Sequence, residues 1–208
     1  MNIAAAILAG GQSRRMGVDK SSLPSLEDAE TTLLQRTVRL AARVFDPVFV
    51  VGRPQPENWP PGDCVTFLPD DERNLGPAGG LASLLRYLIH EDDTARIPVA
   101  LLACDLPLLT LPALTWLKST AEQNLRRHGL VVRNQTQIEP LFAVYTSEVL
   151  PVLEEQLANG KRSLQKLIEV REFTVVDAPP EIRSALVNVN TMEELAHVKS
   201  LTPPFKRS

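Results

Sequence analysis

The stretch "NIAAAILAGG", residues 2–11, decides the fold class of this chain. After Asn2 it is a run of alanine, isoleucine and leucine residues that ends in two glycines. The run shows no alternation of polar and apolar positions, which is typical of a strand buried on both faces of a parallel sheet. In an open α/β sheet, the turn after such a strand is where ligands bind. The stretch therefore predicts both a fold class and the place of a site.

Further apolar runs of similar length recur along the chain and alternate with segments that have helical spacing. The predicted strands are "NIAAAILA" (2–9), "PVFVV" (47–51), "CVTFL" (64–68), "IPVALLA" (97–103), "LVV" (130–132), "IEPLFAVY" (138–145) and "FTVVD" (173–177). The predicted helices cover residues 31–45, 79–90, 111–127, 147–160 and 188–201. Strands that alternate with helices predict a three-layer α/β/α, Rossmann-like fold with a doubly wound, mostly parallel sheet.

Composition limits the classes of function. The chain has 208 residues, 44% of them hydrophobic, which predicts one domain over residues 1–201 and a flexible C-terminal tail over 202–208. A formal net charge of −3 gives no broad basic surface, so we expect no nucleic-acid or membrane partner. The first apolar run is too short to span a bilayer and has no charged leader.

The cysteines and histidines suggest no chemistry of their own. Cys64 and Cys104 are far apart and lack the spacing of a zinc site, so we expect two buried, small hydrophobic side chains in a cytoplasmic protein. His90, His128 and His197 are interpreted as ordinary surface residues.

The loop after the first strand, "GGQSRRMGVDK", combines glycines with positive charge. Gly10 and Gly11 allow a close approach to the backbone, and Arg14 and Lys20 supply cations. Two residues separate Gly17 from Lys20, so this is not a Walker A loop, and a GxGxxG fingerprint is absent. An isolated glycine-rich loop is more often a solvated turn. The interpretation as a site therefore depends on the other strand ends.

Those strand ends also carry polar groups. Asp70 and Asp71 follow the run 64–68, Asp105 follows the run 97–103, and three glycines, Gly76, Gly79 and Gly80, lead into a predicted helix whose N-terminus can face a phosphate. Near the C-terminus, Asn188 and Asn190 point the same way if their segment is extended, although asparagine is also a common turn residue. Lysine and arginine beside a carboxylate that binds Mg²⁺ are what phosphoryl chemistry requires.

Taken together, "LAGGQSRRMGVDK", "GPAGGL", "CDLPLL" and "NVNT" resemble the motifs of the molybdenum cofactor guanylyltransferases. The order and spacing match over roughly residues 2 to 200, and "EPLFAVY" and "GKRSLQKLI" resemble later family segments. The resemblance implies the nucleotide-diphospho-sugar transferase fold and transfer of GMP from GTP to the phosphate of molybdenum-loaded molybdopterin, with release of pyrophosphate. It implies Mg²⁺ as cofactor, GTP and molybdenum-molybdopterin as substrates, and a molybdenum-insertion protein and acceptor molybdoenzymes as further partners.

The resemblance also implies roles for individual residues. The backbone of Leu8, Ala9 and Gly10, with Gly11 as a weaker candidate, would hold the guanosine, and Lys20 would reach the phosphates. Asp70, or its neighbour Asp71, would bind the nucleotide, and Asp105 would bind Mg²⁺ and the nucleotide. Arg14 would neutralise the departing pyrophosphate, and Asn188 and Asn190 would lie near the acceptor or the metal.

Two departures and three rival functions stay open. Gly52-Arg53 stands where family members often have Asn-Arg, and "GPAGG" replaces the commoner GPLAG. A cytidylyltransferase acting on the same pterin, or a nucleotidyltransferase for another phosphate acceptor, would use the same loops. A non-catalytic carrier of molybdopterin or nucleotide is the rival of another class. The cationic loop together with Asp105 favours an enzyme.

Overall fold

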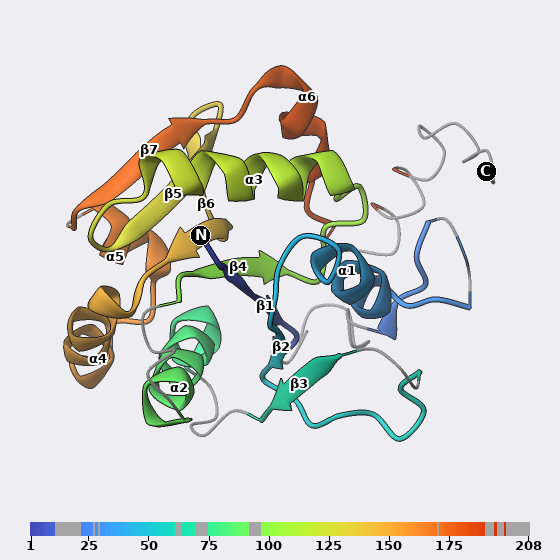
Figure 1. Ribbon diagram of the computed structural model, residues 1–208, viewed down its shortest axis with the longest axis horizontal. Coiled ribbons are helices and arrows are strands. Elements are labelled where there is room, and N and C mark those ends of the chain that lie inside the picture. The colour runs from blue at the N-terminus through green and yellow to red at the C-terminus, as the bar shows by residue number, and fades with distance from the viewer. Residues whose placement is uncertain are drawn as a thin grey trace.

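The computed structural model describes residues 1–10, 22–26, 28, 30–60, 64–69, 75–91, 97–169, 171–189, 194 and 198. Within these residues, the strands form one seven-stranded sheet of order β3-β2-β1-β4-β6-β5-β7 (Figure 1). The strands are β1 (Ala4–Leu8), β2 (Val48–Val51), β3 (Val65–Leu68), β4 (Val99–Ala103), β5 (Gly129–Asn134), β6 (Gln137–Tyr145) and β7 (Phe173–Asp177). All seven predicted strands are confirmed.

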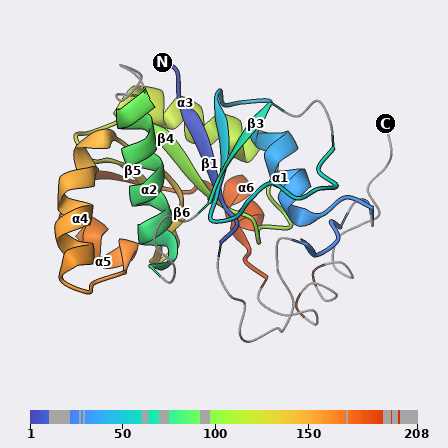
Figure 2. The same cartoon turned by 90° about the horizontal axis from the view of Figure 1, so that it is seen from below.

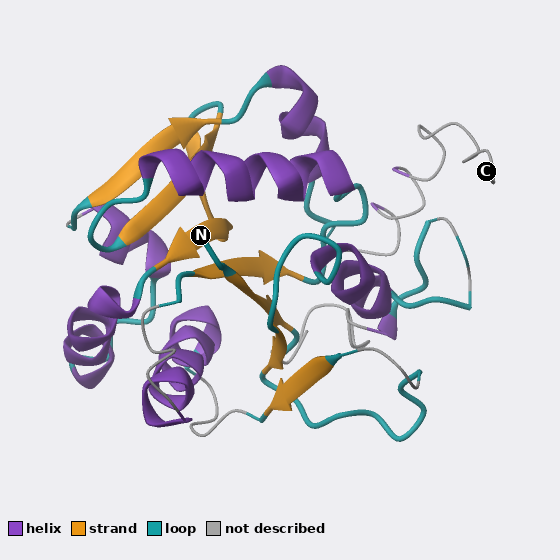
Figure 3. Ribbon diagram, in the orientation of Figure 1, coloured by secondary structure: helices purple, strands orange, loops and turns teal. Residues whose placement is uncertain are grey.

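Helices cover both faces of the sheet, as Figures 1 and 3 show. The helices are α1 (Leu33–Ala41), α2 (Gly76–Glu91), α3 (Leu111–Asn124), α4 (Leu150–Ala158), α5 (Leu164–Glu169) and α6 (Pro180–Arg183), with 3₁₀ turns at η3 (Ser147–Val149) and η4 (Ser184–Leu186). Alternate residues of β1 point to opposite faces: Ala5 and Ile7 pack with α1, α3 and α6, whereas Ala4 and Ala6 pack with α2, α4 and α5. The three-layer α/β/α fold is therefore confirmed.

The central strands are buried on both faces, which explains their continuous apolar sequences. Every residue of β2 and β4 is buried, whereas β3 and β7, the two edge strands, are partly exposed. On the second face, α2 and α4 lie side by side (Figure 2), where Arg86 Nε donates a hydrogen bond to Glu154 Oε1 at 2.7 Å.

The connectivity reverses direction beside β1. From β1 the chain adds β2 and then β3 on one side, and it then crosses over to place β4 on the other side of β1. Only β6, among the described strands, runs antiparallel to its neighbours. The reversal between β1 and β4 is a topological switch point, where open α/β sheets bind their ligands.

The strands around the switch point end level with one another. Leu8 of β1 pairs with Val51 of β2 and with Ala103 of β4, and Val51 pairs in turn with Leu68 of β3. With strands about 4.8 Å apart, the ends of β3 and β4 are about 14 Å from each other. The carboxyl ends of these four strands thus form one rim of the sheet.

Several predicted helix boundaries were wrong. Helix α1 is shorter than the predicted 31–45 and ends at Ala41. It begins at Leu33 because Thr32 and Gln35 form a capping box, with Gln35 N–H to Thr32 Oγ1 at 3.1 Å and Thr32 N–H to Gln35 Oε1 at 2.9 Å. The predicted helix 147–160 divides into η3 and α4. Gly160, with a φ of 71°, follows its end as expected. The short helices α5 and α6 were missed, because elements of six and four residues show too few turns for a periodic pattern.

The C-terminal helix can be compared only in part. Asn188 and Val189, at the start of the predicted span 188–201, are not helical, whereas Glu194 and Val198 are. The other residues of this span, and the predicted tail 202–208, lie outside the described residues.

Two expectations about burial were wrong, those for Cys64 and His128. Cys64 is exposed because it precedes an edge strand, whereas Cys104 is buried as predicted. His128 is buried with 7% exposure, because its Nδ1 accepts a hydrogen bond from Glu172 N–H at 3.2 Å and its ring lies against Phe173. In the proline-rich loop 53–60, Trp59 is buried against Phe67, with ring centroids 4.9 Å apart.

Candidate active site

The candidate site begins where β1 and β4 end next to each other. The pairing of Leu8 with Ala103 places Ala9 and Gly10, which follow β1, beside Asp105, two residues after β4. Ala9 N–H donates to the carbonyl oxygen of Val51 at 2.9 Å, which continues the ladder past the end of the strand. Gly10 is exposed beyond that point. The loop thus leaves the sheet at the switch point.

Asp105 is held in place by a segment from the far end of the chain. Val189 N–H donates to the carbonyl oxygen of Asp105 at 3.2 Å. Val189 is 1% exposed and packs with Leu23 and Leu33, so it anchors its segment against the residues after the glycine loop. As a result, Asn188 lies exposed at the same edge of the sheet as Asp105.

The structure brings together part of the predicted set. Leu8, Ala9, Gly10, Asp105 and Asn188 are described and lie around the ends of β1 and β4. The remaining predicted residues, namely Gly11, Arg14, Lys20, Asp70, Asp71 and Asn190, lie outside the described residues.

Gly79 and Gly80 lie within helix α2 and not in a loop that precedes it. Helix α2 begins at Gly76, three residues earlier than predicted, so Gly79 and Gly80 are helical. Gly76 has a φ of 64°, which suits glycine at this entry turn. A Cβ at Gly79 would lie 2.3 Å from Cβ of Leu75, so this glycine is required by packing.

Gly52, one of the departures from the family pattern, has a backbone reason. Its φ is 100°, and its N–H donates to the carbonyl oxygen of Leu68 at 2.9 Å. Glycine adopts this conformation at little cost. The backbone conformation of the turn after β2 therefore favours glycine at position 52.

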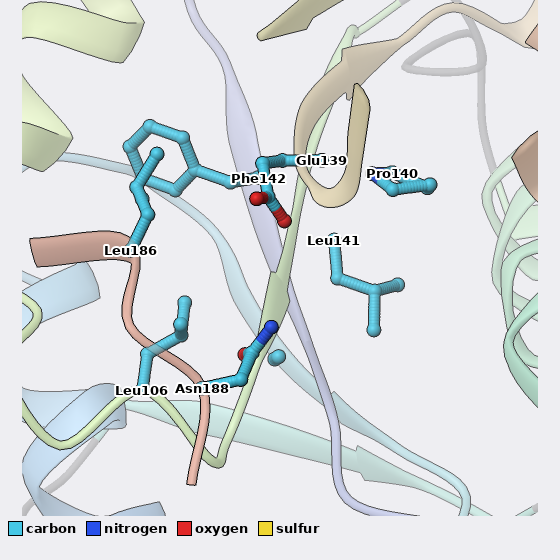
Figure 4. A pocket seen from close by; sticks show the side chains of 8 residues that line it. Leu106, Glu139, Pro140, Leu141, Phe142, Leu186 and Asn188 are labelled. Atoms are coloured by element: carbon cyan, nitrogen blue, oxygen red, sulfur yellow. The ribbon is translucent and has the colours of Figure 1, made fainter. Parts of the chain in front are cut away.

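A pocket opens beside Asp105, between β4, β6 and the C-terminal segment (Figure 4). Its volume is about 120 Å³. Leu106 lies next to Asp105 in the sequence and lines the pocket, as do Phe142 of β6, Leu186 of η4, and Asn188. The two chain segments joined by the Asp105–Val189 hydrogen bond therefore also form a wall of this pocket.

Glu139 supplies the acidic group of this pocket, and sequence reasoning missed it. Burial raises the pKa of the Glu139 carboxyl, and a side-chain hydrogen bond with Asn134 opposes this rise. Figure 4 shows the Glu139 carboxylate and the Asn188 side chain pointing into the same space. The available signal was a lone carboxylate inside the apolar run "IEPLFAVY". Such a residue needs a partner or a ligand when it is buried.

An irregularity in β6 positions Glu139. The register of β5 with β6 shifts between Val131, which pairs with Ala143, and Val132, which pairs with Glu139. Pro140 lies in the bulged segment, where its missing N–H costs no ladder bond. Tyr145 Oη donates to the carbonyl oxygen of Pro140 at 2.9 Å, and burial raises the pKa of this phenol. A buried hydroxyl thus fixes the bulge that carries Glu139.

The polar groups at the site suit a metal that is shared with a substrate. Among the described residues, no cluster of three or more His, Cys, Asp or Glu side chains could hold a metal ion alone. Mg²⁺ is usually bound by one or two protein carboxylates together with substrate phosphates and water. Asp105 and the amide oxygen of Asn188 fit that mode.

Comparison with known proteins identifies the family. Residues 5–177 match the MobA-like NTP transferase domain. The chain belongs to the MobA-like NTP transferase family. A probable molybdenum cofactor guanylyltransferase from Synechococcus elongatus is 34% identical over 194 residues, which cover 92% of this chain and 95% of the relative. The molybdenum cofactor guanylyltransferase of Syntrophotalea carbinolica is 31% identical over 196 residues, covering 91% and 87% of the two chains.

A solved structure shows the same fold. Molybdopterin-guanine dinucleotide biosynthesis protein A from Archaeoglobus fulgidus superposes with a TM-score of 0.74 at 18% identity, covering 96% of this chain and 98% of that protein. The two chains thus share one fold over nearly their whole lengths. Within the described residues, no helix is long and apolar enough to cross a membrane.

Proposed function

We propose that this MobA-like chain transfers GMP from GTP to molybdenum-loaded molybdopterin, forming the guanine dinucleotide cofactor and releasing pyrophosphate. The observation that carries the proposal is the pairing of β1 with β4, which places the start of the glycine loop beside Asp105 at the switch point. Relatives named molybdenum cofactor guanylyltransferase, at 31% and 34% identity, support the choice of reaction.

The proposed reaction is a direct in-line displacement, in which an oxygen of the pterin phosphate attacks the α-phosphorus of GTP. Positioning and stabilisation of charge account for catalysis of this kind. The backbone of Leu8, Ala9 and Gly10 would hold the guanosine, with Gly11 in support. Asp70, or less directly Asp71, would bind the nucleotide at the end of β3, about 14 Å across the rim from β4.

The charged residues have separate proposed roles. Lys20 would contact the phosphates of GTP, and Arg14 would neutralise the departing pyrophosphate. Asp105 would hold Mg²⁺, with Asn188 or Asn190 nearby. When bound, Mg²⁺ would offset the negative charge on the phosphate oxygens.

The proposal extends to the catalytic domain, the cellular location and the partner proteins. We assign residues 1–201 to one catalytic domain, which is supported by the single sheet that the described strands form. A cytoplasmic location is supported by the exposed free thiol of Cys64, because such thiols persist in reducing compartments. A molybdenum-insertion protein would supply the acceptor, and molybdoenzymes would receive the product.

Pyrophosphate release tests this function. The purified chain is mixed with Mg²⁺, molybdenum-loaded molybdopterin and either GTP or CTP, and the dinucleotide product is identified by mass. We expect pyrophosphate and the guanine dinucleotide with GTP only. Product from CTP would identify a cytidylyltransferase, and binding of GTP without pyrophosphate would identify a carrier.

A further inference from the structure

The pocket beside Asp105 has a polar pair and apolar walls. The carboxylate of Glu139 and the amide of Asn188 point into it from opposite sides, and Leu106, Leu141, Phe142 and Leu186 surround them (Figure 4). Glu139 is on β6 and Asn188 follows η4, so only the tertiary fold brings the two groups together. An apolar pocket with a few polar groups that fix the orientation of a ligand is typical of a small-molecule site.

The hydrogen-bonding capacity of this pair defines the ligand. An ionised carboxylate can only accept hydrogen bonds, and a side-chain amide can donate two. A 2-amino-4-oxopyrimidine ring has along one edge an amino group, a ring N–H and a carbonyl oxygen. Glu139 can accept from the first two, and the Asn188 amide can donate to the third. The carboxylate is half-buried and has one side-chain hydrogen bond, with Asn134, so its remaining acceptor sites are open to a ligand.

Two substrates of the proposed reaction carry this edge, the guanine of GTP and the pterin of the acceptor. Position distinguishes them. The glycine loop follows β1, and β2 and β3 extend the rim on that side, whereas Glu139 lies on β6, on the opposite side of β4. A ligand in the pocket would thus approach Asp105 from the side opposite the nucleotide. A volume of about 120 Å³ is small beside the roughly 300–1,000 Å³ of whole-ligand pockets, so it suits the edge of a ring.

We propose that Glu139, with Asn188 opposite, recognises the 2-amino-4-oxopyrimidine edge of the acceptor pterin and thereby sets the acceptor specificity of the enzyme. This inference rests on the proposed function for the identity of the acceptor. In the proposed complex, the apolar walls cover the ring, and the pterin phosphate extends toward Asp105.

Direct binding of a stable pterin tests this role without turnover. The probes are 6-hydroxymethylpterin and 6-hydroxymethyl-lumazine, which has a carbonyl in place of the 2-amino group, and their Kd values are measured by calorimetry with the full chain. We expect the wild-type protein to bind the pterin at least about 10-fold more tightly than the lumazine, because a hydrogen bond to a charged group has that effect.

The variants separate recognition from pocket shape. Glu139→Gln should weaken pterin binding about 10-fold or more and remove the preference over lumazine. Asn188→Ala should weaken both probes equally, because both retain the 4-carbonyl. Glu155→Gln, at an exposed position on α4, is the matched control and should change neither Kd. If Glu139→Gln fails to fold, Asn188→Ala still tests the proposed position of the ring, because Asn188 is exposed. Its substitution should weaken the binding of pterin and of lumazine by the same factor.

Three results would overturn the inference. They are equal weakening of pterin and lumazine by Glu139→Gln, unequal weakening by Asn188→Ala, and weakened binding of GTP by Glu139→Gln with pterin binding retained, which would assign the edge to guanine. The proposed function fails separately, because it predicts pyrophosphate from GTP. A wild-type chain that makes no product but still distinguishes pterin from lumazine through Glu139 would disprove the reaction and leave this pocket as a pterin site.

Discussion

The N–H of Val189 donates a hydrogen bond to the carbonyl oxygen of Asp105 at 3.2 Å, and this bond joins the C-terminal segment to the end of β4. Val189 is buried with Leu23 and Leu33, so the contact is anchored by a small apolar cluster as well as by the backbone. The Val189 segment therefore helps to position both Asp105, the candidate metal ligand, and the pocket that Asn188 lines.

Truncating that anchor should weaken folding. Val189→Ala removes two buried carbon atoms, and we expect the free energy of unfolding to fall by about 2 kcal/mol, measured by urea denaturation. Val187→Ala is the matched control, because Val187 is 40% exposed two residues earlier, and its effect should stay within about 0.5 kcal/mol. Equal effects of the two substitutions would contradict the anchoring role.

Replacing Asp105 should impair catalysis much more than folding. Asp105→Asn removes the charge from a partly exposed side chain at a strand end, where little core packing is lost. We expect kcat/KM for GMP transfer to fall about 100-fold or more, with the thermal midpoint nearly unchanged. Asp177→Asn, at the exposed ion pair with Arg133, is the control and should retain activity. Near-normal transfer by Asp105→Asn would disprove the metal-binding role.

Lys20 should act on the triphosphate. Lys20→Ala should raise the KM for GTP about 10-fold or more and leave unfolding by heat unchanged, because the loss is one charge-assisted contact to phosphate. Lys166→Ala, at an exposed lysine on α5, should leave both quantities unaltered. Unchanged GTP saturation in Lys20→Ala would remove this residue from the site.

The bulge that carries Glu139 should depend on Tyr145. Tyr145→Phe leaves the carbonyl oxygen of Pro140 without its hydroxyl donor, and we expect a loss of about 1–2 kcal/mol in the free energy of unfolding. Burial raises the pKa of Tyr145 above its ordinary value of 10.0, so the unfolded chain loses this proton first, and stability should fall as the pH rises above 10.0.

Urea titrations at several pH values from 8 upward would measure both effects. The part of the alkaline loss that depends on Tyr145 should be absent in Tyr145→Phe and present in Tyr87→Phe, at a half-buried tyrosine on α2. An identical alkaline profile for wild type and Tyr145→Phe would count against this assignment.

His128 should make the protein less stable in mild acid. Burial is the main cause that lowers the pKa of His128 below 6.5, with a smaller contribution from Arg127. The neutral imidazole is therefore favoured by folding, and its contribution is complete above pH 6.5 and is lost as the pH falls through the lower folded-state pKa. We expect His128→Gln to flatten the decline in stability between about pH 7 and 5. His90 is exposed, so His90→Gln should leave the decline in stability as it is in the wild type. An equal flattening of the decline in His90→Gln would refute the role of His128.

The sequence alone was enough for the sheet and for the approximate place of the site. The central strands are buried on both faces, so their continuous apolar runs, such as residues 99–103, are distinct from the amphipathic helices between them. The positions of Gly10 and Asp105 after such runs predicted that they belong to one rim, because parallel strands end at the same edge. Short elements such as α5 had no comparable signal.

What only the tertiary structure decided depends on neighbours that are distant in the chain. The antiparallel insertion of β6 beside β4 places Glu139 near Asp105, and the return of the C-terminal segment places Asn188 opposite it. No local pattern encodes this pairing, because the strand order and the bulge at Pro140 arise from packing across the whole sheet. Local apolar periodicity determined the layers of this protein, whereas long-range strand pairing determined which polar groups face one another.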